Sequence, residues 1–224
     1  MITLHHLEYS QSFRILWLLE ELGLDYGLKL YERDPKTRLA PKAYKEISPL
    51  GTAPVITDGD LTLCETNAII DYLLDQNQSS TLRPKSGEEN RTQYLFWIHA
   101  AQASLTPMLL IDTVLRAVIE RSPWPVRLVI RPILNMVLTS FVKPRMNRLL
   151  ELAEAALEEN DYFAGDTLTA ADIVMGYSLE SAKSRDYVND DHANCLGWLQ
   201  RVKQSASFKQ AVEKDGKPSI IFWK

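Results

Sequence analysis

The first thirty residues show two different hydrophobic patterns. Ile2–Leu7 is short and rich in β-branched and aliphatic residues, which predicts a strand. From Ser12 onward the apolar residues recur at helical spacing, at Ile15, Leu16, Leu19 and Leu22. Gly23 marks the end of this helix, and Tyr26–Tyr31 predicts a second strand. The order strand, helix, strand predicts two parallel strands joined by a right-handed crossover.

The next forty-five residues add elements that complete a small α/β domain. A short helix is predicted around Lys42–Glu46. Asp58-Gly59 is a strong hairpin signal between two short strands over 55–57 and 61–63, and a helix is expected over 66–74. The order βαβαββα over residues 1–76 is that of a thioredoxin-like domain, and residues 77–87 read as a linker.

No convincing strand pattern follows the linker. Ser86 and Glu89 have the spacing of a capping box, so a helix is expected to begin there. Proline-marked residues 123–132 should break or bend the chain. An all-helical domain is predicted over 88–224, with helices over 88–121, 127–159, 170–183, 193–203 and 205–213.

Charge and cysteine content exclude some functional classes. Lys and Arg total 25 against 29 acidic residues, a net charge of -4, so the basic surplus typical of nucleic-acid binding is absent. Cys64 and Cys195 have no metal-ligand spacing and read as free thiols in a reducing compartment, so no metal is predicted. No signal peptide is apparent at the N-terminus, which favours a cytoplasmic location.

One segment, Val126–Val142, is apolar enough that a membrane-spanning helix must be considered. Arg127, Arg131 and Asn135 interrupt it, and it is shorter than the roughly 20 apolar residues of a spanning helix. We therefore expect no integral membrane span and interpret the segment as a buried or subunit-facing helix, with peripheral membrane contact as the alternative.

Glu65 and Thr66 lie where the predicted helix over 66–74 begins. A helix N-terminus offers unpaired backbone N–H groups and a partial positive charge, which suit a carboxylate. The Glu65 side chain has the opposite charge and suits an ammonium group. An α-amino acid carries both groups on one carbon, and the γ-glutamyl end of glutathione is one such ligand. An ordinary helix with an acidic first turn is the alternative.

Four motifs in order make the chain resemble a cytosolic-type glutathione S-transferase. They are Tyr9–Arg14 at the first helix, Ser48–Val55 before the third strand, Glu65–Ala68 at the third helix, and Gly165–Asp172 in the helical half. Within that family the chain is most similar to the GTT-type transferases of fungi and bacteria, which share Arg14–Glu20, Tyr31–Asp34 and Arg38–Pro41 as they stand here. The resemblance covers nearly the whole chain.

The resemblance implies a catalytic role for Ser10, because theta-like relatives place the catalytic serine at the start of a Ser-Gln-x-x-Arg phrase. Its hydroxyl would donate a hydrogen bond to the glutathione thiolate. From the residues alone an ordinary helix cap is the favoured interpretation of Ser10, and the resemblance reverses this preference. Tyr9 is the rival, since other classes use a tyrosine here, and Ser12 is a third candidate, better suited to capping the helix.

The remaining site roles also follow from the resemblance. Ala53-Pro54 is expected to be a cis peptide that pairs with the cysteinyl backbone, although a plain strand-initiating proline is the simpler reading. Glu65 and Thr66 would bind the γ-glutamyl group. Thr52 lies near where the glycine carboxylate should point, with Arg38 and Lys42 as weaker candidates. An apolar electrophile is expected between the domains, with a wall drawn from Tyr9, Phe13, Trp97, Gln102 and Leu105.

Two further motifs are interpreted as structural. Thr169 and Asp172 form a capping box, with Leu168 and Ile173 placed as its hydrophobic staple, so Asp172 should support folding and not chemistry. Cys64 is expected to pack in the interior. The neighbouring histidines His5 and His6 are assigned no role.

The predicted function is therefore glutathione transfer to an electrophilic carbon, or reduction of an organic peroxide, by a homodimer. Glutathione would be the co-substrate and no cofactor is expected. The alternatives are a non-catalytic glutathione-binding carrier or regulator of the same fold, and a glutathione-dependent disulfide reductase. The chain has no Cys-x-x-Cys in the Ser10–Phe13 window, so exchange by its own thiols is not expected.

Overall fold

The computed structural model describes residues 1–216. The N-terminal domain contains a four-stranded sheet in the order β2-β1-β3-β4. β1 (Ile2–Leu7) pairs in parallel with β2 (Gly27–Tyr31), and antiparallel with β3 (Val55–Asp58), which in turn pairs antiparallel with β4 (Leu61–Cys64). Helices α1 (Ser12–Leu22), α2 (Lys42–Lys45) and α3 (Thr66–Gln76) complete the predicted βαβαββα order, which confirms the thioredoxin-like fold.

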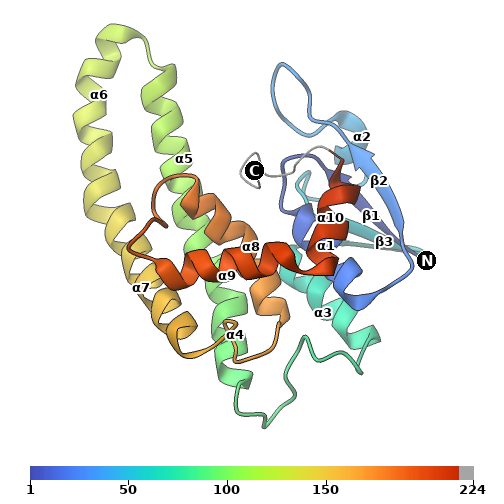
Figure 1. Cartoon of the computed structure of the whole chain (residues 1–224). Coiled ribbons are helices and arrows are strands. Elements are labelled where there is room, and N and C mark those ends of the chain that lie inside the picture. Colours follow the sequence, from blue (N-terminus) through green and yellow to red (C-terminus); the bar gives the residue numbers. More distant parts are fainter. Residues whose placement is uncertain (217–224) are drawn as a thin grey trace.

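A bundle of helices forms the C-terminal domain (Figure 1). The described helices are α4 (Arg91–Ala100), α5 (Thr106–Arg121), α6 (Trp124–Val137), α7 (Lys143–Glu159), α8 (Ala170–Lys183), α9 (Ala193–Gln204) and α10 (Ala206–Asp215). Two π-helical turns, η1 (Ala101–Leu105) and η2 (Leu138–Val142), join α4 to α5 and α6 to α7 without a break. The prediction of an all-helical second half is confirmed as far as residue 216.

Helix boundaries differ from the prediction in two places. The first long helix begins at Arg91 and not at 88, because Ser86 and Glu89 form no capping box; the Glu88 carboxylate instead accepts from the Lys85 N–H. The proline-marked stretch interrupts the helix at Ser122 and Pro123 alone. Pro132 lies inside α6 on an exposed surface.

Helix α8 passes through the centre of the helical domain, and its N-terminus holds two segments together. The Thr169–Asp172 capping box is formed as predicted. The Ala170 N–H also donates to the Leu82 carbonyl at 2.8 Å, which ties the linker to this helix. Trp17 of α1 and Trp198 of α9 are both fully buried and approach Gly176 on α8. One apolar core therefore runs across both domains.

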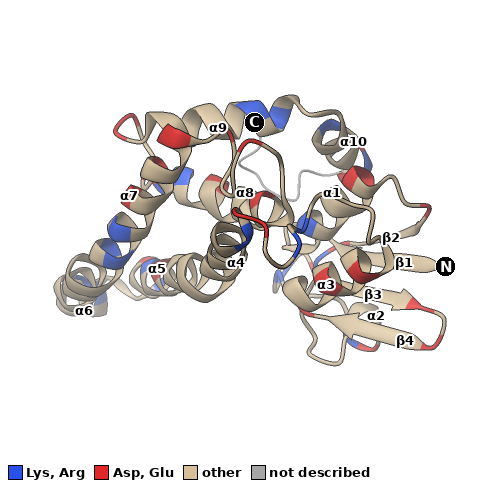
Figure 2. Ribbon diagram, turned by 90° about the horizontal axis from the view of Figure 1, so that it is seen from below, with Lys and Arg blue, Asp and Glu red and all other residues tan. Residues whose placement is uncertain are grey.

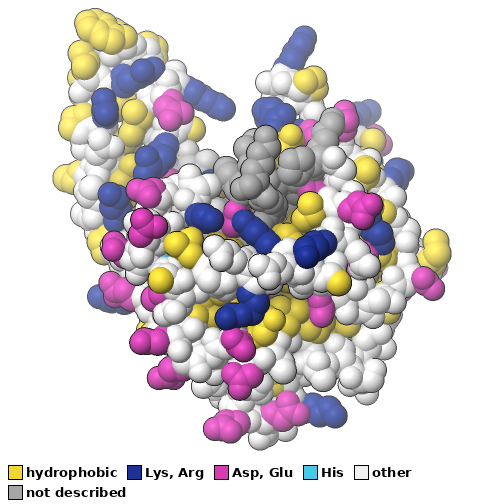
Figure 3. Space-filling model, viewed as in Figure 1, with side chains coloured by type: hydrophobic (Ala, Val, Ile, Leu, Met, Phe, Trp, Pro, Cys, Tyr) yellow, Lys and Arg dark blue, Asp and Glu magenta, His cyan; other side chains and the backbone are white. Residues whose placement is uncertain are grey.

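The α5–α6 hairpin extends away from this core (Figure 1). No residue of α6 is buried, and Figure 3 shows hydrophobic side chains along the projecting hairpin. By length and apolar composition the continuous helices 91–121 and 124–159 could each cross a membrane, and only 17% and 11% of their most apolar windows are buried. The same length and composition also occur in core helices of proteins that do not span a membrane.

Charged residues show no comparable segregation between the domains. In the view of Figure 2, acidic and basic positions are distributed over helices of both domains. This distribution agrees with the small net charge of -4. The distinctive surface of this chain is therefore the apolar hairpin.

Candidate active site

A cavity of about 360 Å³ lies where the two domains meet at the N-terminal end of α3. Its size is within the range of small-molecule pockets. The N-terminal domain contributes the start of α1, the loop before β3 and the start of α3, and the helical domain contributes η1. The lining residues are Gln11, Thr52, Ala53, Pro54, Glu65, Thr66, Asn67 and Gln102.

Glu65 and Thr66 meet the cavity as the sequence pattern indicated. Glu65 immediately precedes α3 with a φ of 73°, a left-handed conformation that is uncommon for a residue with a side chain and is concentrated at functional sites. Its carboxylate is the only charged side chain among the residues of the described chain that line the cavity. Thr66 is the first residue of α3 and is buried. The cavity therefore brings one negative charge next to the positive end of a helix.

The loop before β3 presents its backbone to the same cavity. Ser48 fixes this loop, since its hydroxyl donates to the Thr52 carbonyl at 2.8 Å and accepts from the Thr52 N–H at 3.1 Å. The Ala53–Pro54 peptide is cis, as expected. Of the six residues predicted for the site, five (Thr52, Ala53, Pro54, Glu65 and Thr66) line one cavity.

Ser10, the sixth, lies beside this cavity but is not among its lining residues. It is nearly buried, at 6% exposed, between the end of β1 and the start of α1. The Ser10 hydroxyl donates to the Leu7 carbonyl at 2.7 Å, contacts the Ser12 hydroxyl at 2.7 Å and accepts from the Ser12 N–H at 3.2 Å. The hydroxyl is therefore held by local groups, one residue from the cavity wall at Gln11.

The two alternatives to Ser10 have other surroundings. Tyr9 has a φ of 51°, and the guanidinium of Arg38 lies over its ring, 5.0 Å from the ring centre. Neither Tyr9, Arg38 nor Lys42 lines the cavity. Ser12 is not the predicted helix cap, because Gln11 occupies that position and makes no side-chain cap bond. The Ser12 hydroxyl instead accepts from the Leu7 N–H and contacts His6.

No role was predicted for Gln11, whose side chain is held by groups from both domains. Its Oε1 accepts from Arg14 Nη1 at 2.5 Å and from Gln102 Nε2 at 3.2 Å. Arg14 has only donors, so the side-chain atom that faces it must be the oxygen. This assignment leaves the Gln11 amide nitrogen as a donor for a ligand. The Ser-Gln-x-x-Arg phrase was the available signal for this residue.

Arg14 adds a fully buried positive charge beneath the start of α1. Its guanidinium donates to Ser178 at 2.7 Å and lies 4.9 Å from the Tyr177 ring centre. Burial lowers the pKa of Arg14 to about 10, so the side chain stays charged at neutral pH. Because Gln11 bonds it directly, the charge polarises an amide on the cavity wall.

Asn67 was also missed. Its amide nitrogen donates to the Ile98 carbonyl at 3.1 Å, which joins α3 to α4. Its Oδ1 is buried and has no hydrogen-bond partner among the described residues. A buried acceptor without a partner is costly, and a ligand donor in the adjoining cavity would satisfy it. No periodicity in the sequence distinguishes this residue from the other polar positions of α3.

The expected aromatic wall for an electrophile is wrong in three positions. Phe13 is 1% exposed and packs edge-on against Phe208, while Trp97, at 3% exposed, packs against Phe163. Leu105 is fully buried. The resemblance suggested these residues for a pocket wall, but Phe13 packs between α1 and α10, and Trp97 packs within the helical domain. Gln102 does line the cavity, at the π-helical turn η1.

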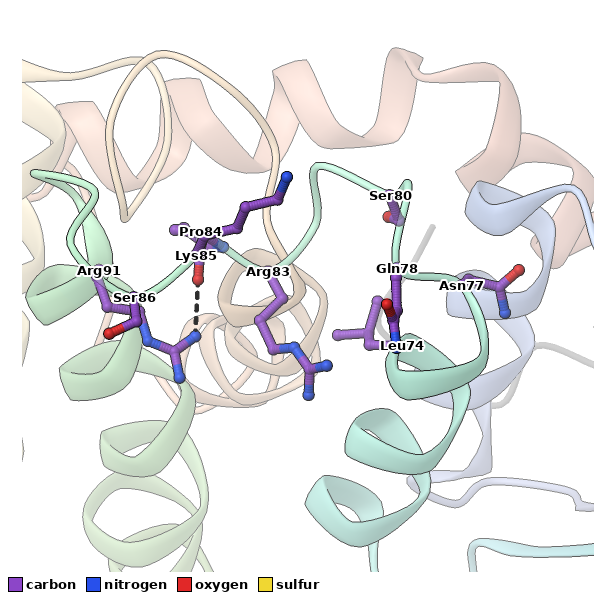
Figure 4. A pocket seen from close by; sticks show the side chains of 9 residues that line it. All are labelled: Leu74, Asn77, Gln78, Ser80, Arg83, Pro84, Lys85, Ser86 and Arg91. Carbon is purple, nitrogen blue, oxygen red and sulfur yellow. Dashed lines mark hydrogen bonds between the residues drawn. The ribbon is translucent and has the colours of Figure 1, made fainter.

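A second cavity, of about 410 Å³, lies beneath the linker (Figure 4). Arg91 donates to the Pro84 carbonyl at 2.8 Å across it, and Arg83 is paired with Asp71 and Asp75 of α3. None of the predicted site residues lines it. The polar side chains around it hold the linker against the two domains.

The thiols and the acidic residues suggest no other centre in residues 1–216. Cys64 is partly buried and lies 3.9 Å from the Ser48 hydroxyl, and Cys195 is buried against Glu154. Burial raises the pKa of the Cys195 thiol, so it is not a reactive thiolate. Within the described residues no group of three or more His, Cys, Asp or Glu could hold a metal ion.

The fold defines a class of protein in which a thioredoxin-like domain is joined to an all-helical domain, with a cavity where the two meet. Two family models match the chain: Glutathione S-transferase, N-terminal domain, over residues 10–76, and Glutathione S-transferase, C-terminal domain, over residues 139–206. Glutathione S-transferase 3 of Schizosaccharomyces pombe is 33% identical over 96% of this chain and 88% of its own length. Glutathione S-transferase 1 of Saccharomyces cerevisiae is 27% identical over 96% and 95%.

Solved structures agree with these relatives. A glutathione S-transferase from Actinobacillus pleuropneumoniae has a TM-score of 0.80 and 31% identity, and the match covers 98% of this chain and 94% of that one. A sphingomonad glutathione S-transferase complexed with glutathione has a TM-score of 0.72 and 19% identity, and the match covers 96% of this chain and 99% of that one. It shares the fold.

The chain belongs to the glutathione S-transferase family. It is a transferase that uses glutathione as its co-substrate.

Proposed function

We propose that the cavity at the N-terminus of α3 holds the γ-glutamyl group of glutathione, with Glu65 bound to the ammonium and Thr66 to the carboxylate. One observation supports this assignment. Glu65 is the only charged side chain among the described residues that line the cavity, and it adjoins the helix end that favours an anion. The unpartnered Asn67 Oδ1 offers a second acceptor for the ammonium group. A dipolar amino-acid head group matches all three features.

The remainder of the peptide would then run along the loop before β3. In this arrangement the Ala53 backbone pairs with the cysteinyl residue, and Thr52 lies near the glycine carboxylate. Support comes from the fixed position of this loop, which Ser48 holds through two hydrogen bonds to Thr52. The cysteinyl sulfur would point toward the start of α1, where Ser10 and Gln11 lie.

Ser10 is proposed as the catalytic residue, donating a hydrogen bond to the thiolate. A free thiol has a pKa of about 8.5, and lowering it by about two units requires roughly 2.7 kcal/mol in favour of the anion. One hydrogen bond to a charged acceptor contributes about 1.5–3 kcal/mol. The Gln11 amide, polarised by the buried Arg14 charge, adds to this. For Ser10 to act, its proton must turn from the Leu7 carbonyl to the sulfur.

The reaction follows from the bound thiolate. The thiol proton leaves to solvent, the sulfur forms a bond to an electrophilic carbon, and the leaving group departs with its electron pair. In the peroxidase variant the thiolate attacks an oxygen of an organic peroxide, the O–O bond breaks, and the alkoxide leaves and takes up a proton. The glutathione sulfenic acid that forms reacts with a second glutathione thiol to give the disulfide and water. The protein contributes the thiolate and a fixed orientation between it and an apolar electrophile. The non-catalytic carrier is not favoured, since the homologues are named transferases.

A conjugation assay on two single variants tests the catalytic assignment. Ser10→Ala should lower kcat by roughly 10- to 100-fold, the equivalent of one charge-assisted hydrogen bond, and change the KM for glutathione less. Tyr9→Phe is the matched control and should retain activity within about twofold. A large loss in Tyr9→Phe with Ser10→Ala near wild type would contradict the assignment.

We also propose a homodimer formed through the exposed apolar faces of the long helices. Between α5 and α7 a cavity of about 530 Å³ is lined by Met108, Leu149 and Leu152 together with Arg145 and Arg148. Large exposed apolar surface of this kind marks an interface. The apolar side chains on the adjoining α5–α6 hairpin that are at least 45% exposed are Leu110, Val114, Val118, Trp124, Val126, Leu128, Val129, Ile133 and Met136.

Sedimentation equilibrium tests the dimer directly. The expected mass is twice the 25.5 kDa of one chain. Leu152→Asp should shift the equilibrium toward monomer, whereas Asp166→Ala, a surface change elsewhere in the helical domain, should not. A mass of 25.5 kDa for the wild type at micromolar concentration would contradict the proposal.

We place the enzyme in the cytoplasm, with glutathione as its co-substrate and no additional cofactor. The two free thiols, Cys64 and Cys195, support a reducing compartment. The absence of an additional cofactor can be tested by dialysing the protein exhaustively against a chelator. Activity is then measured with glutathione and an electrophile alone. Activity that returns only after a metal or organic cofactor is added would contradict it.

A further inference from the structure

A chain of hydrogen-bonding side chains connects the end of the last described helix to Ser10. The Asp215 carboxylate of α10 contacts His6 Nε2 at 2.5 Å. His6 Nδ1 lies 3.0 Å from the Ser12 hydroxyl, which lies 2.7 Å from the Ser10 hydroxyl. Four side chains from β1, α1, the turn between them and α10 are thus joined in one continuous path. Figure 1 shows α10 beside α1 at the edge of the sheet.

Every member of this path is buried. His6 and Asp215 have side chains that are each 1% exposed, and Ser12 is fully buried. Buried ionisable groups are retained at high cost unless they are paired, and the Asp215 carboxylate and the His6 imidazole are paired with each other. The second ring nitrogen, His6 Nδ1, lies against the Ser12 hydroxyl.

The direction of the path follows from counting protons. A serine hydroxyl has one proton and two acceptor sites. Ser12 Oγ accepts from the Leu7 N–H at 3.2 Å, and a proton on His6 Nδ1, which is part of the proposal below, would fill its second site. The Ser12 proton must therefore be donated, either to Ser10 Oγ at 2.7 Å or to the Leu7 carbonyl at 3.2 Å, and the shorter contact favours Ser10.

The same count then fixes the role of Ser10. Its oxygen accepts from the Ser12 N–H at 3.2 Å and from the Ser12 hydroxyl, so both acceptor sites are filled. The Ser10 proton can only be donated, and its present acceptor is the Leu7 carbonyl at 2.7 Å. A hydroxyl that accepts from a polarised donor is itself a stronger donor, because hydrogen bonds in series reinforce one another.

We propose that His6, paired with Asp215, has a proton on Nδ1, and that these two residues are positioning residues that act through Ser12 to hold the Ser10 hydroxyl as a donor toward the glutathione thiolate. This proposal rests on the catalytic role proposed for Ser10. If His6 were neutral with Nδ1 as an acceptor, the Ser12 proton would turn to His6 and the Ser10 proton to Ser12. The thiolate would then lose its donor, although every heavy atom kept its place.

Of the other contacts that join α10 to α1, two are suited to a control. Trp17 Nε1 donates to the Ser207 hydroxyl at 3.2 Å, and Lys214 contacts Glu20 at 2.6 Å. Both attach the same helix, and neither contacts Ser10 or Ser12. A merely structural role for Asp215 predicts that loss of its contact resembles loss of the Lys214 contact.

The experiment measures the pKa of the bound glutathione thiol, from the ultraviolet absorbance of the thiolate, in the full chain. Asp215→Asn keeps the size of the side chain and removes its charge. We expect it to raise this pKa by about one unit and to lower kcat between about threefold and tenfold, with the glutathione dissociation constant changed less than about twofold. Lys214→Met should leave all three at the wild-type value.

A double variant separates positioning from structure. In the Ser10→Ala background Asp215→Asn should produce no further change in the thiol pKa, because the last hydroxyl of the path, that of Ser10, is then absent. An equal shift in both backgrounds, or no shift in the wild-type background, would overturn the proposal. If Asp215→Asn does not fold, Ser12→Ala interrupts the path while leaving the His6–Asp215 pair intact, and the same outcomes apply. If Ser10→Ala alone leaves the thiol pKa unchanged, the role proposed for Ser10 fails instead.

Discussion

Two buried aspartates, one at the start of α8 and one at the end of α10, show how differently this fold uses a carboxylate. Asp172 is fully buried and accepts from the Phe163 N–H, the Thr169 N–H and hydroxyl, and the Trp198 indole. Asp215 is 4% exposed, and its contact with His6 joins positions 209 residues apart in the chain.

The difference lies in where each network ends. The Asp172 network is closed, since each of its donors belongs to the core of the helical domain. The Asp215 network continues through His6 and Ser12 to Ser10, beside the cavity. A closed network stabilises the fold. A network with one end at a cavity can in addition control the state of the group at that end. Substitutions can separate these two uses.

The largest effect is expected when Asp172 is removed. Asp172→Ala leaves two backbone N–H groups and the Trp198 indole without their acceptor, and each unsatisfied buried group costs about 1–3 kcal/mol. We expect a loss of about 3–5 kcal/mol in the free energy of unfolding, measured by urea denaturation at fixed protein concentration. Asp166→Ala, an exposed acid in the same loop, should cost less than about 0.5 kcal/mol. A loss below 1 kcal/mol for Asp172→Ala would show that the capping box is not a major support.

A smaller effect, confined to substrate binding, is expected at Glu65. Glu65→Gln keeps the shape and removes the charge that we assign to the γ-glutamyl ammonium. The KM for glutathione should rise about tenfold or more while kcat changes little, because this interaction is the same in the ground state and the transition state. Steady-state kinetics with varied glutathione measure both constants. Asp71→Asn, an exposed acid on α3, should leave them unchanged, and an unchanged KM in Glu65→Gln would exclude the ammonium contact.

The smallest effect is a dependence of stability on pH. Burial raises the pKa of Asp172 to about 6, although its hydrogen bonds act in the opposite direction. Because the folded-state pKa lies above the unfolded value of about 3.9, the folded chain binds this proton more tightly. Its contribution is complete below about pH 4 and is lost as the pH rises through about 6. The stability of the wild type relative to Asp172→Asn should fall by about 1 kcal/mol between about pH 5 and pH 7. A constant difference would contradict the raised pKa.

Local patterns predicted the fold, and they predicted the closed network as well. The capping box joins Thr169 to Asp172, three residues apart, so both partners fall within one short window of sequence. The strands, the hairpin at Asp58-Gly59 and most helices were confirmed for the same reason. The cis peptide at Ala53–Pro54 was expected from the family resemblance alone.

Sequence patterns could not predict the contacts between distant segments. His6 read as an ordinary strand residue, and only the docking of α10 against β1 brings Asp215 to it. Phe13 and Trp97 were expected at a pocket wall from the resemblance and are core residues, because the family's general architecture does not reveal whether an aromatic side chain faces a ligand or another helix. The Gln11 side chain is positioned by hydrogen bonds from Arg14 and Gln102, and Gln102 belongs to the helical domain.

A crystal structure of the complex with glutathione tests the central claim most directly. The account predicts the cysteinyl sulfur within hydrogen-bonding distance of the Ser10 hydroxyl, the γ-glutamyl ammonium at Glu65 and its carboxylate at Thr66 and the start of α3. A sulfur bound by the Tyr9 hydroxyl, with Ser10 still donating to the Leu7 carbonyl, would contradict it.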